Sequence, residues 1–220
     1  DRRNQAIPYY SRKEINTLRK FHKRSKPLVW LESRVDRFFL EIQGSGRIIL
    51  NQGDVMRVHY AISNGNPYRS VGRYLINKNE VKKKDMSMQA IRQWLVKNPV
   101  RMDEVLHHND SFVFFKEEES GPFGCLEVEV TPLRSIATDQ KFMPKGALGF
   151  MSVQLPEKNE MKSPEGWKEK SFFVLNQDTG GAIKGPDRAD LFCGNGKYAE
   201  FTAGHMNQYG QLYFLVPRSK

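Results

Sequence analysis

Residues 178–192 read DTGGAIKGPDRADLF, and this stretch places two aspartates, Asp178 and Asp190, on either side of a glycine-rich turn. An aspartate in front of Thr-Gly-Gly ordinarily accepts backbone hydrogen bonds, so Asp178 fits a structural role as well as a chemical one. Asp190 differs because alanine, leucine and phenylalanine surround it, and an apolar setting raises the pKa of a carboxyl group. A carboxyl that stays protonated near neutrality can deliver a proton to a leaving oxygen, as glycosidases do. The stretch by itself therefore predicts either a turn residue or a glycosidase acid at Asp190.

The last third of the chain reads as strands separated by turns. Its short apolar runs end at clusters of glycine, proline and asparagine, which is typical of a β-rich domain. A third aspartate, Asp139, also lies beside a turn. The predicted strands are 126–131, 147–155, 171–175 and 212–216, and a polar surface loop is predicted over 156–170.

The first 120 residues mix helices with strands. Ser11 and Glu14 form a capping box that predicts a helix reaching about Lys23. Ser87 is expected to cap a second helix, whose apolar residues recur at helical spacing as far as about Val96. The other expected elements are a helix over 102–107, strands over 37–43, 55–61 and 111–115, and turns at 44–46 and 64–67.

The composition is that of a folded, basic protein. The chain has 220 residues, of which 39% are hydrophobic, and its formal net charge is +10. Its length allows one large domain or two small ones. No run approaches the roughly 20 apolar residues that cross a bilayer, and the first residues lack the apolar core of a signal peptide. The charge favours an anionic partner, but no RNA-binding, zinc-finger or helix-turn-helix signature is present, so we expect no nucleic-acid partner.

Motifs for other kinds of site are missing. No Gly-x-Ser-x-Gly elbow occurs, and the glycines at 44–46 lack the remaining residues of a nucleotide-binding loop. Glu104 and the two histidines at 107–108 have the spacing of a metal site, yet such residues are common at helix ends. Cys125 and Cys193 either pair in an oxidising compartment or stay as thiols. We expect neither a cofactor nor a metal.

Five blocks of the sequence occur in the order of a known family. They are LEIQGSG at 40–46, NGNPYRSVGR at 64–73, MSMQAIR at 86–92, SFVFF at 111–115 and DTGGAIKG at 178–185. Together they closely resemble the membrane-bound lytic transglycosylase A family, which cuts bacterial peptidoglycan. The resemblance extends from about Pro8 to the end of the sequence.

The resemblance implies a mainly β fold, in which a smaller β domain with a few helices is inserted into a double-psi β-barrel. On this map, residues 1–125 are the inserted glycan-binding domain with adjoining segments. Residues 126–220 are the C-terminal half of the barrel, which is the catalytic domain. Family members carry a further N-terminal stretch that forms the first half of the barrel, so we expect that half to be missing from this chain or supplied by a separate chain.

The resemblance also assigns chemistry to single residues. Asp190 matches the acid/base aspartate of the family, while Asp178 and Asp139 match the other two aspartates of the barrel half. Asp190 would protonate the oxygen between N-acetylmuramic acid and N-acetylglucosamine, then accept the proton of the muramoyl C6 hydroxyl as that oxygen closes on C1. A 1,6-anhydro end results. Five residues are expected to bind the glycan: Gln43, Ser45, Tyr68, Gln89 and Lys184. The alternatives are a plain turn at 44–46 and a solvated lysine at 184.

By the same resemblance, the partners are peptidoglycan strands and proteins of a wall-synthesis complex. The expected location is the periplasm of a Gram-negative bacterium, on the outer membrane, through a lipid anchor outside this chain. The main alternative is a non-catalytic module that binds cell-wall polysaccharide, because related barrels in expansin-like proteins bind without cutting. Retention of Asp190 favours the enzyme.

Overall fold

The computed structural model describes residues 7–18, 26–157 and 164–218. The chain divides into two compact units, Asp1–Pro122 and Phe123–Lys220. These units differ by three positions from the expected segments 1–125 and 126–220.

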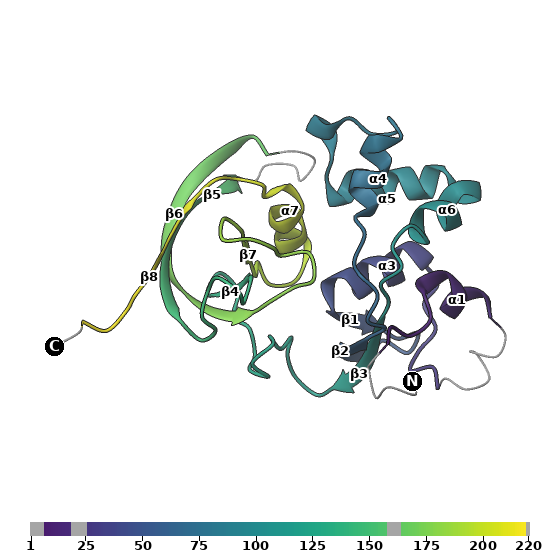
Figure 1. Cartoon of the computed structure of the whole chain (residues 1–220), viewed down its shortest axis with the longest axis horizontal. Coiled ribbons are helices and arrows are strands. Elements are labelled where there is room, and N and C mark those ends of the chain that lie inside the picture. Colours follow the sequence, from purple (N-terminus) through teal and green to yellow (C-terminus); the bar gives the residue numbers. More distant parts are fainter. Residues whose placement is uncertain (1–6, 19–25, 158–163, 219–220) are drawn as a thin grey trace. The chain divides into compact units, whose positions relative to one another are not determined.

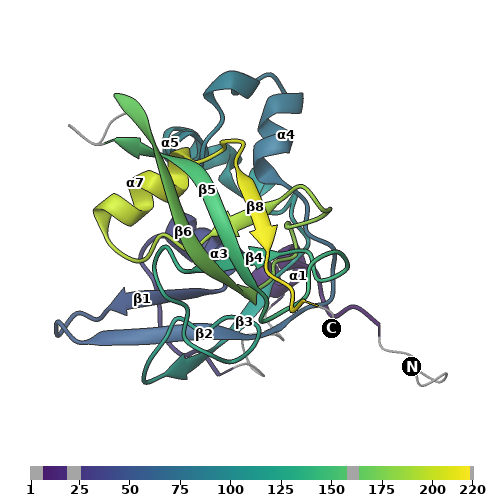
Figure 2. The same cartoon turned by 90° about the vertical axis from the view of Figure 1, so that its left-hand side faces the viewer.

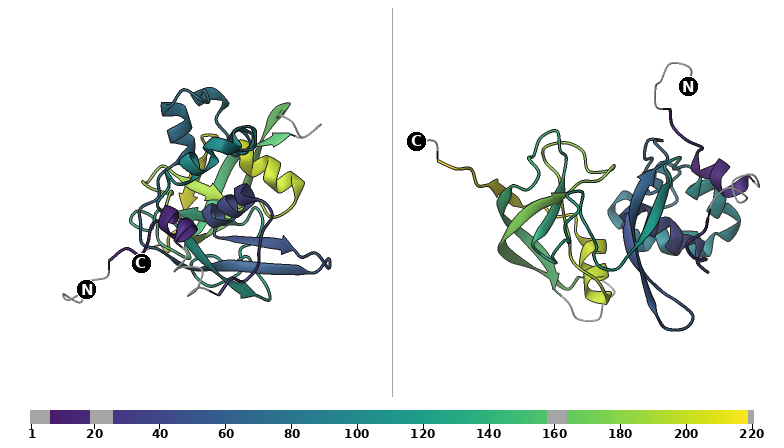
Figure 3. Two further views of the ribbon diagram at one scale, coloured as in Figure 1. Left: turned by 90° about the vertical axis from the view of Figure 1, so that its right-hand side faces the viewer. Right: turned by 90° about the horizontal axis from the view of Figure 1, so that it is seen from below.

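The first unit combines helices with a three-stranded antiparallel sheet. Its elements are α1 (Arg12–Thr17), α3 (Arg34–Gln43), β1 (Ser45–Ile49), β2 (Val55–Ser63), α4 (Val71–Asn77), η1 (Lys83–Asp85), α5 (Met88–Lys97), η2 (Pro99–Arg101), α6 (Met102–Leu106) and β3 (Val113–Glu118). The sheet has the order β1-β2-β3. Helix α3 packs against the sheet, and α4, α5 and α6 lie beyond α3 (Figure 1). Because β3 pairs with β2 only from Arg57 onward, the tip of the β1–β2 hairpin extends past β3 (Figure 3).

Helix α3 occupies residues for which a strand over 37–43 was expected, and that prediction is wrong. The Ser33 side chain caps the helix by accepting a hydrogen bond from the Asp36 amide at 3.0 Å. Gly44 ends it with φ at 77°, a left-handed conformation that glycine adopts without strain. Strand β1 then begins at once, where a turn over 44–46 was expected. Three apolar residues of α3 recur at helical spacing and are buried: Val35, Phe38 and Phe39.

The helices predicted at Ser11, at Ser87 and from residue 102 begin where expected, the last of them without a side-chain cap. Ser87 accepts a hydrogen bond from the Ala90 amide at 3.1 Å, so the predicted start of α5 is confirmed. The helix predicted from residue 102 is confirmed as α6. The capping box of α1 is formed as predicted, but this helix ends at Thr17, and residue 23 lies outside the described residues.

The core of the first unit lies among its helices. Leu75 of α4, Leu95 of α5 and Val105 of α6 have no exposed surface. They pack with the buried face of α3 in one hydrophobic cluster. Burial of each such side chain contributes about 1.5–3 kcal/mol, so the cluster holds the helices against one another.

The second unit is built on a five-stranded sheet. Its elements are β4 (Ser135–Thr138), β5 (Leu148–Glu157), β6 (Gly166–Asp178), β7 (Ala189–Leu191), α7 (Lys197–His205) and β8 (Gln211–Phe214). The strand order is β7-β4-β6-β5-β8, and β4 and β6 are parallel. Strands β5 and β6 are long and curved, with β8 beside β5 (Figure 2). Helix α7 lies on the inner side of the curve (Figure 1).

The strands predicted over 147–155, 171–175 and 212–216 are confirmed as β5, β6 and β8. The strand predicted over 126–131 is wrong, because Glu127 has φ at 56° and the chain turns back on itself, leaving one isolated bridge between Phe123 and Glu129. The prediction of a loop over 156–170 is also wrong at both ends, because β5 extends to Glu157 and β6 begins at Gly166. There Pro156 pairs with Trp167 as β5 and β6 extend toward each other.

The fold is a mixed α/β structure with two sheets, so the expected mainly β class needs correction. Helix α3 contributes to this difference. Its caps and its apolar residues at helical spacing favour a helix where a strand was expected. Within the described residues, the second sheet is open: β7 and β8 are its two edges and do not pair with each other.

Candidate functional site

Strand β4 lies between two of the expected catalytic aspartates. In the register of the sheet, Ala137 of β4 is opposite Asp178 of β6 on one side and Asp190 of β7 on the other. Neighbouring strands lie about 4.8 Å apart, so the Cα atoms of these aspartates are roughly 10 Å apart. Asp139 follows directly after the end of β4. The structure therefore brings three aspartates from three separate segments to one end of β4.

Asp190 does not have the apolar environment that its neighbours in the sequence suggest. Ala189 and Leu191 pack against the hydrophobic core of the unit. Side chains alternate along a strand, so Asp190 points to the opposite face. There its side chain is 45% exposed and pairs with Arg188, at 2.8 Å from Nε to Oδ1 and 2.9 Å from Nη2 to Oδ2. The expectation of apolar surroundings for the Asp190 side chain is wrong.

Residues 179–185, here called the glycine loop, are fastened to β4 and to Asp139. The Thr179 hydroxyl donates to the carbonyl of Thr138 at 3.0 Å, and the Gly185 amide donates to Asp139 Oδ2 at 2.9 Å. The Lys141 amide donates to the other carboxylate oxygen at 3.1 Å. These two amides, Gly185 first, lower the pKa of Asp139, because they stabilise its charged form. Asp139 therefore anchors the glycine loop.

Asp139→Asn is expected to weaken this anchor and to remove part of the acid sensitivity of the fold. The folded pKa of Asp139 lies below its unfolded value of about 4, so its contribution is fully present above that pH. It is lost as the pH falls through the folded pKa. Thermal unfolding should show the variant a few degrees less stable than the parent at pH 7, with a smaller difference at pH 3. An equal loss at both pH values, or the same loss in the exposed control Asp187→Asn, would contradict the anchor.

Asp178 makes the backbone contact expected of a structural residue. Its Oδ1 accepts a hydrogen bond from the Cys125 amide at 3.0 Å. The Cys125 thiol lies 3.4 Å from the carbonyl of Gln177. Both cysteines are free, and burial raises the pKa of Cys193 to about 11. Asp178 thus holds the start of the second unit against the end of β6.

Lys184 lies on the glycine loop and is exposed. Its positive charge contributes to the lowered pKa of Asp139, after the two backbone amides. The structure therefore places this expected glycan contact beside the aspartate cluster, on the same loop that Asp139 anchors.

Three of the glycan contacts expected in the first unit lie near the C-terminal end of α3. Gln43 is the last residue of α3 and is exposed; its Nε2 lies 3.9 Å from the sulfur of Met88 at the start of α5. Gln89 is the next residue of α5, and Ser45 begins β1 directly after α3. The fourth, Tyr68, lies in the loop between β2 and α4 and is 36% exposed.

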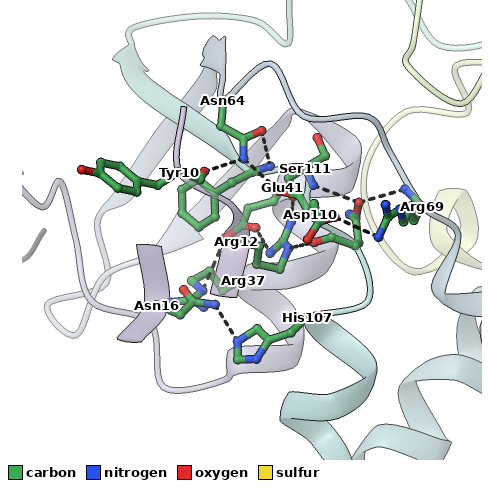
Figure 4. A network of polar contacts seen from close by, with 12 residues as sticks. Tyr10, Arg12, Asn16, Arg37, Glu41, Asn64, Arg69, His107, Asp110 and Ser111 are labelled. Carbon is green, nitrogen blue, oxygen red and sulfur yellow. Dashed lines mark hydrogen bonds and ion pairs between the residues drawn. The ribbon is translucent and has the colours of Figure 1, made fainter. Parts of the chain in front are cut away.

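Two buried asparagines, Asn64 and Asn109, hold the loop that carries Tyr68, and Figure 4 shows Asn64 beside Tyr10. The side-chain amide of Asn64 donates to the carbonyl of Tyr10 at 2.8 Å. The side-chain oxygen of Asn109 accepts a hydrogen bond from the Arg69 amide at 3.0 Å. The loop is therefore fixed at both ends by groups that solvent does not reach.

Arg12 of α1 joins the same network and is 2% exposed (Figure 4). It forms an ion pair with Glu41 of α3 and donates to the carbonyls of Asn109 at 3.0 Å and Ser111 at 2.6 Å. Burial lowers the pKa of Arg12 and raises the pKa of Glu41. Both directions oppose charge, so desolvation outweighs the attraction between the two groups.

Sequence reasoning missed Arg188 and Arg12. The spacing of Arg188 and Asp190 carried a usable signal, because residues two apart on a strand share one face. Arg12 carried no comparable signal, since its partner Glu41 lies 29 positions away.

The part of the chain that the structure describes offers no group of three or more His, Cys, Asp or Glu side chains placed to hold a metal ion. Among its helices, none combines the length and the apolar character needed to cross a bilayer.

Comparisons with known proteins match both units. Residues 1–116 match the MltA specific insert domain, and residues 134–216 match the 3D domain. Membrane-bound lytic murein transglycosylase A of Escherichia coli (strain K12) is 38% identical over 191 residues, which cover 86% of this chain and 51% of that protein. The chain spans about half the length of the curated relatives that it matches.

Solved structures agree with these matches. A membrane-bound lytic murein transglycosylase from Agrobacterium tumefaciens has a TM-score of 0.83 at 34% identity, covering 95% of this chain and 57% of its own. The structure of E. coli MltA with bound chitohexaose has a TM-score of 0.77 at 32% identity, covering 95% of this chain and 64% of its own.

Proposed function

The chain belongs to the MltA family, that of membrane-bound lytic murein transglycosylase A, and from this premise we propose that it cleaves peptidoglycan glycan strands with Asp190 as acid and base. The bond cut is the β-1,4 bond between N-acetylmuramic acid and N-acetylglucosamine. One observation carries the proposal. Asp190 lies on the edge strand β7, and its side chain is exposed. It is level with Asp178 of β6 across the sheet, because both are opposite Ala137 of β4. There a glycan can reach it from solvent.

The proposed reaction moves one proton in two steps. The Asp190 carboxyl gives its proton to the glycosidic oxygen as the bond from that oxygen to C1 breaks. The carboxylate then takes the proton of the muramoyl C6 hydroxyl as the C6 oxygen bonds to C1. Because the nucleophile belongs to the substrate, its high effective molarity replaces a bound water, and one carboxyl serves both steps.

The other two aspartates have supporting roles in this proposal. Asp139 anchors the glycine loop through the Gly185 amide, and Asp178 holds the Cys125 amide. Neither needs to exchange a proton with the glycan. In the full catalytic domain, the five-stranded sheet would form part of a double-psi β-barrel, which would complete the surroundings of Asp190.

Glycan binding is proposed to extend to the first unit and to Lys184. A relative of this chain has been solved with bound chitohexaose, a chain of amino sugars. In the first unit, Gln43, Ser45 and Gln89 offer hydrogen-bonding groups close to one helix end, and Tyr68 offers an aromatic ring on a fixed loop. Lys184 would meet a carboxylate of the peptide stem.

The proposed location follows from the substrate. Peptidoglycan lies outside the inner membrane, and the relatives are named membrane-bound. We place the protein in the periplasm as an outer-membrane lipoprotein whose anchor lies outside this chain, where it would work beside proteins of wall synthesis.

Digestion of purified peptidoglycan tests the proposal directly. The products are separated and identified by mass spectrometry, with a full-length MltA relative as the positive control. Muropeptides with 1,6-anhydro ends are the expected result. Reducing ends would instead identify a hydrolase, and either reducing ends or no products would reject transglycosylation by this chain.

A non-catalytic wall-binding module is the second candidate, and one observation favours it. Arg188 donates to both carboxylate oxygens of Asp190, so the ion pair occupies the two atoms that would have to meet the glycosidic oxygen. A binding module would pull down with insoluble peptidoglycan but release no muropeptides. The same digestion therefore separates the two candidates.

A further inference from the structure

Arg188 joins three parts of the site through one guanidinium group. Its Nε and Nη2 hold the two carboxylate oxygens of Asp190 at 2.8 and 2.9 Å, which is the parallel fork that arginine makes with a carboxylate. Its Nη1 donates to the carbonyl of Ala182 in the glycine loop at 2.9 Å. The carboxylate is thus tied to the glycine loop, which Asp139 in turn anchors through Gly185.

The three hydrogen bonds of Arg188 do more than a typical ion pair on the surface does. Exposed pairs contribute about 0–1 kcal/mol to stability, and both side chains here are nearly half exposed. The additional bond to Ala182 fixes the plane of the guanidinium group, so the pair also fixes the direction of the carboxylate. Without it, an exposed aspartate on an edge strand would rotate freely among its rotamers.

We propose that Arg188 is a positioning residue for Asp190, an inference that rests on the proposed function. After Asp190 has given up its proton, Arg188 holds the two carboxylate oxygens with both donors, as the observed fork shows. When Asp190 carries its proton on Oδ2, Nε keeps Oδ1 in place while Nη2 releases Oδ2. Oδ2 then gives the proton to the glycosidic oxygen as the bond to C1 breaks, the fork closes on the carboxylate, and Oδ2 later accepts the C6 hydroxyl proton as the ring closes.

Arg188→Met tests this role, because methionine keeps the apolar stem and removes every donor. We expect kcat to fall about 100-fold, which is the cost of a misplacement near 1 Å, with KM unchanged. Arg188→Lys should lie between the parent and Arg188→Met, since a lysine offers charge without the fork. Arg134→Met is the matched control: Arg134 is exposed in the same unit and donates to the carbonyl of Leu133, and its loss should leave kcat unchanged.

Two further measurements separate positioning from other effects. In a double-mutant cycle, Arg188→Met should cause no additional loss when Asp190 is already asparagine. The carboxyl carbon signal of Asp190 in NMR should move in Arg188→Met and stay in place in Arg134→Met. This second readout does not depend on activity.

The outcomes are distinct. An unmoved NMR signal in Arg188→Met overturns the positioning role, whatever the activity. A moved signal with full kcat overturns its importance for catalysis. If the parent protein forms no anhydro products, the proposed function fails, and the NMR comparison still decides whether Arg188 positions Asp190.

Discussion

Asp190→Asn is expected to reduce the formation of anhydro-muropeptides by about 10²–10⁴-fold, the usual range for the loss of a positioned general acid or base. Asparagine has the size of aspartate but cannot donate the proton to the glycosidic oxygen or accept it from the C6 hydroxyl. In the proposed mechanism both proton transfers depend on this one carboxyl, so the variant should lose both. The measurement is the rate of anhydro product release from purified peptidoglycan, followed by mass spectrometry.

The control for this variant lies three residues earlier. Asp187 is exposed on the same segment, and Asp187→Asn should keep the parent rate. Asp190→Asn should also keep its fold, because the lost pair with Arg188 is exposed and contributes about 0–1 kcal/mol at most. Full activity of Asp190→Asn would refute the acid/base role and make Asp178→Asn the next variant to measure.

Arg12→Met is expected to lower the free energy of unfolding by about 3–5 kcal/mol, the range observed when one partner of a buried ion pair is removed. The loss arises because Glu41, whose side chain is 2% exposed, would lose its close partner and keep the longer contact to Arg37 at 3.4 Å. The carbonyls of Asn109 and Ser111 would also lose their donors. Urea unfolding gives the free energy directly.

The double variant Arg12→Met, Glu41→Met shows where this cost originates. Burial shifts the pKa of each partner toward its neutral form, so removal of both charges relieves two desolvation costs. The double variant should therefore be more stable than Arg12→Met alone. As a control, Arg34→Met breaks an exposed pair with Asp103 and should cost less than about 1 kcal/mol. A double variant less stable than Arg12→Met would show that the pair is a net source of stability.

The Arg12 network also bears on substrate binding. It shares Asn109 with the loop that carries Tyr68, and Asn109 joins the Arg12 side chain to the Arg69 amide. Loosening the N-terminal segment should therefore loosen that loop. If Tyr68 contacts the glycan, Arg12→Met should weaken glycan binding under conditions in which the first unit is still folded.

Much of the fold was predictable because its signals are local. Ser87 and Ser11 each cap a helix whose first turn lies next to them in the chain. The signals for α3 are equally local, because the Ser33 cap outweighs the aromatic content of residues 37–43 that predicted a strand. By contrast, the turn that contains Glu127 is held against the end of β6 by contacts from Cys125 to Gln177 and Asp178, which lie 52 and 53 positions away and which spacing along the chain does not reveal.

The candidate site likewise combines features that the sequence predicts with features that depend on tertiary contacts. Five blocks spread over the chain are enough to identify the family, and Asp139, Asp178 and Asp190 are each recognisable in the sequence as an aspartate beside a turn. Their environments depend on the pairing of strands that lie far apart in the sequence. Pairing of β4 with β6 and β7 places two of them on either side of Ala137, and strand alternation turns Asp190 away from its apolar neighbours toward Arg188. The physical reason is that composition near a residue does not specify which face of a strand it occupies, and that face is set by partners 40 or more positions away.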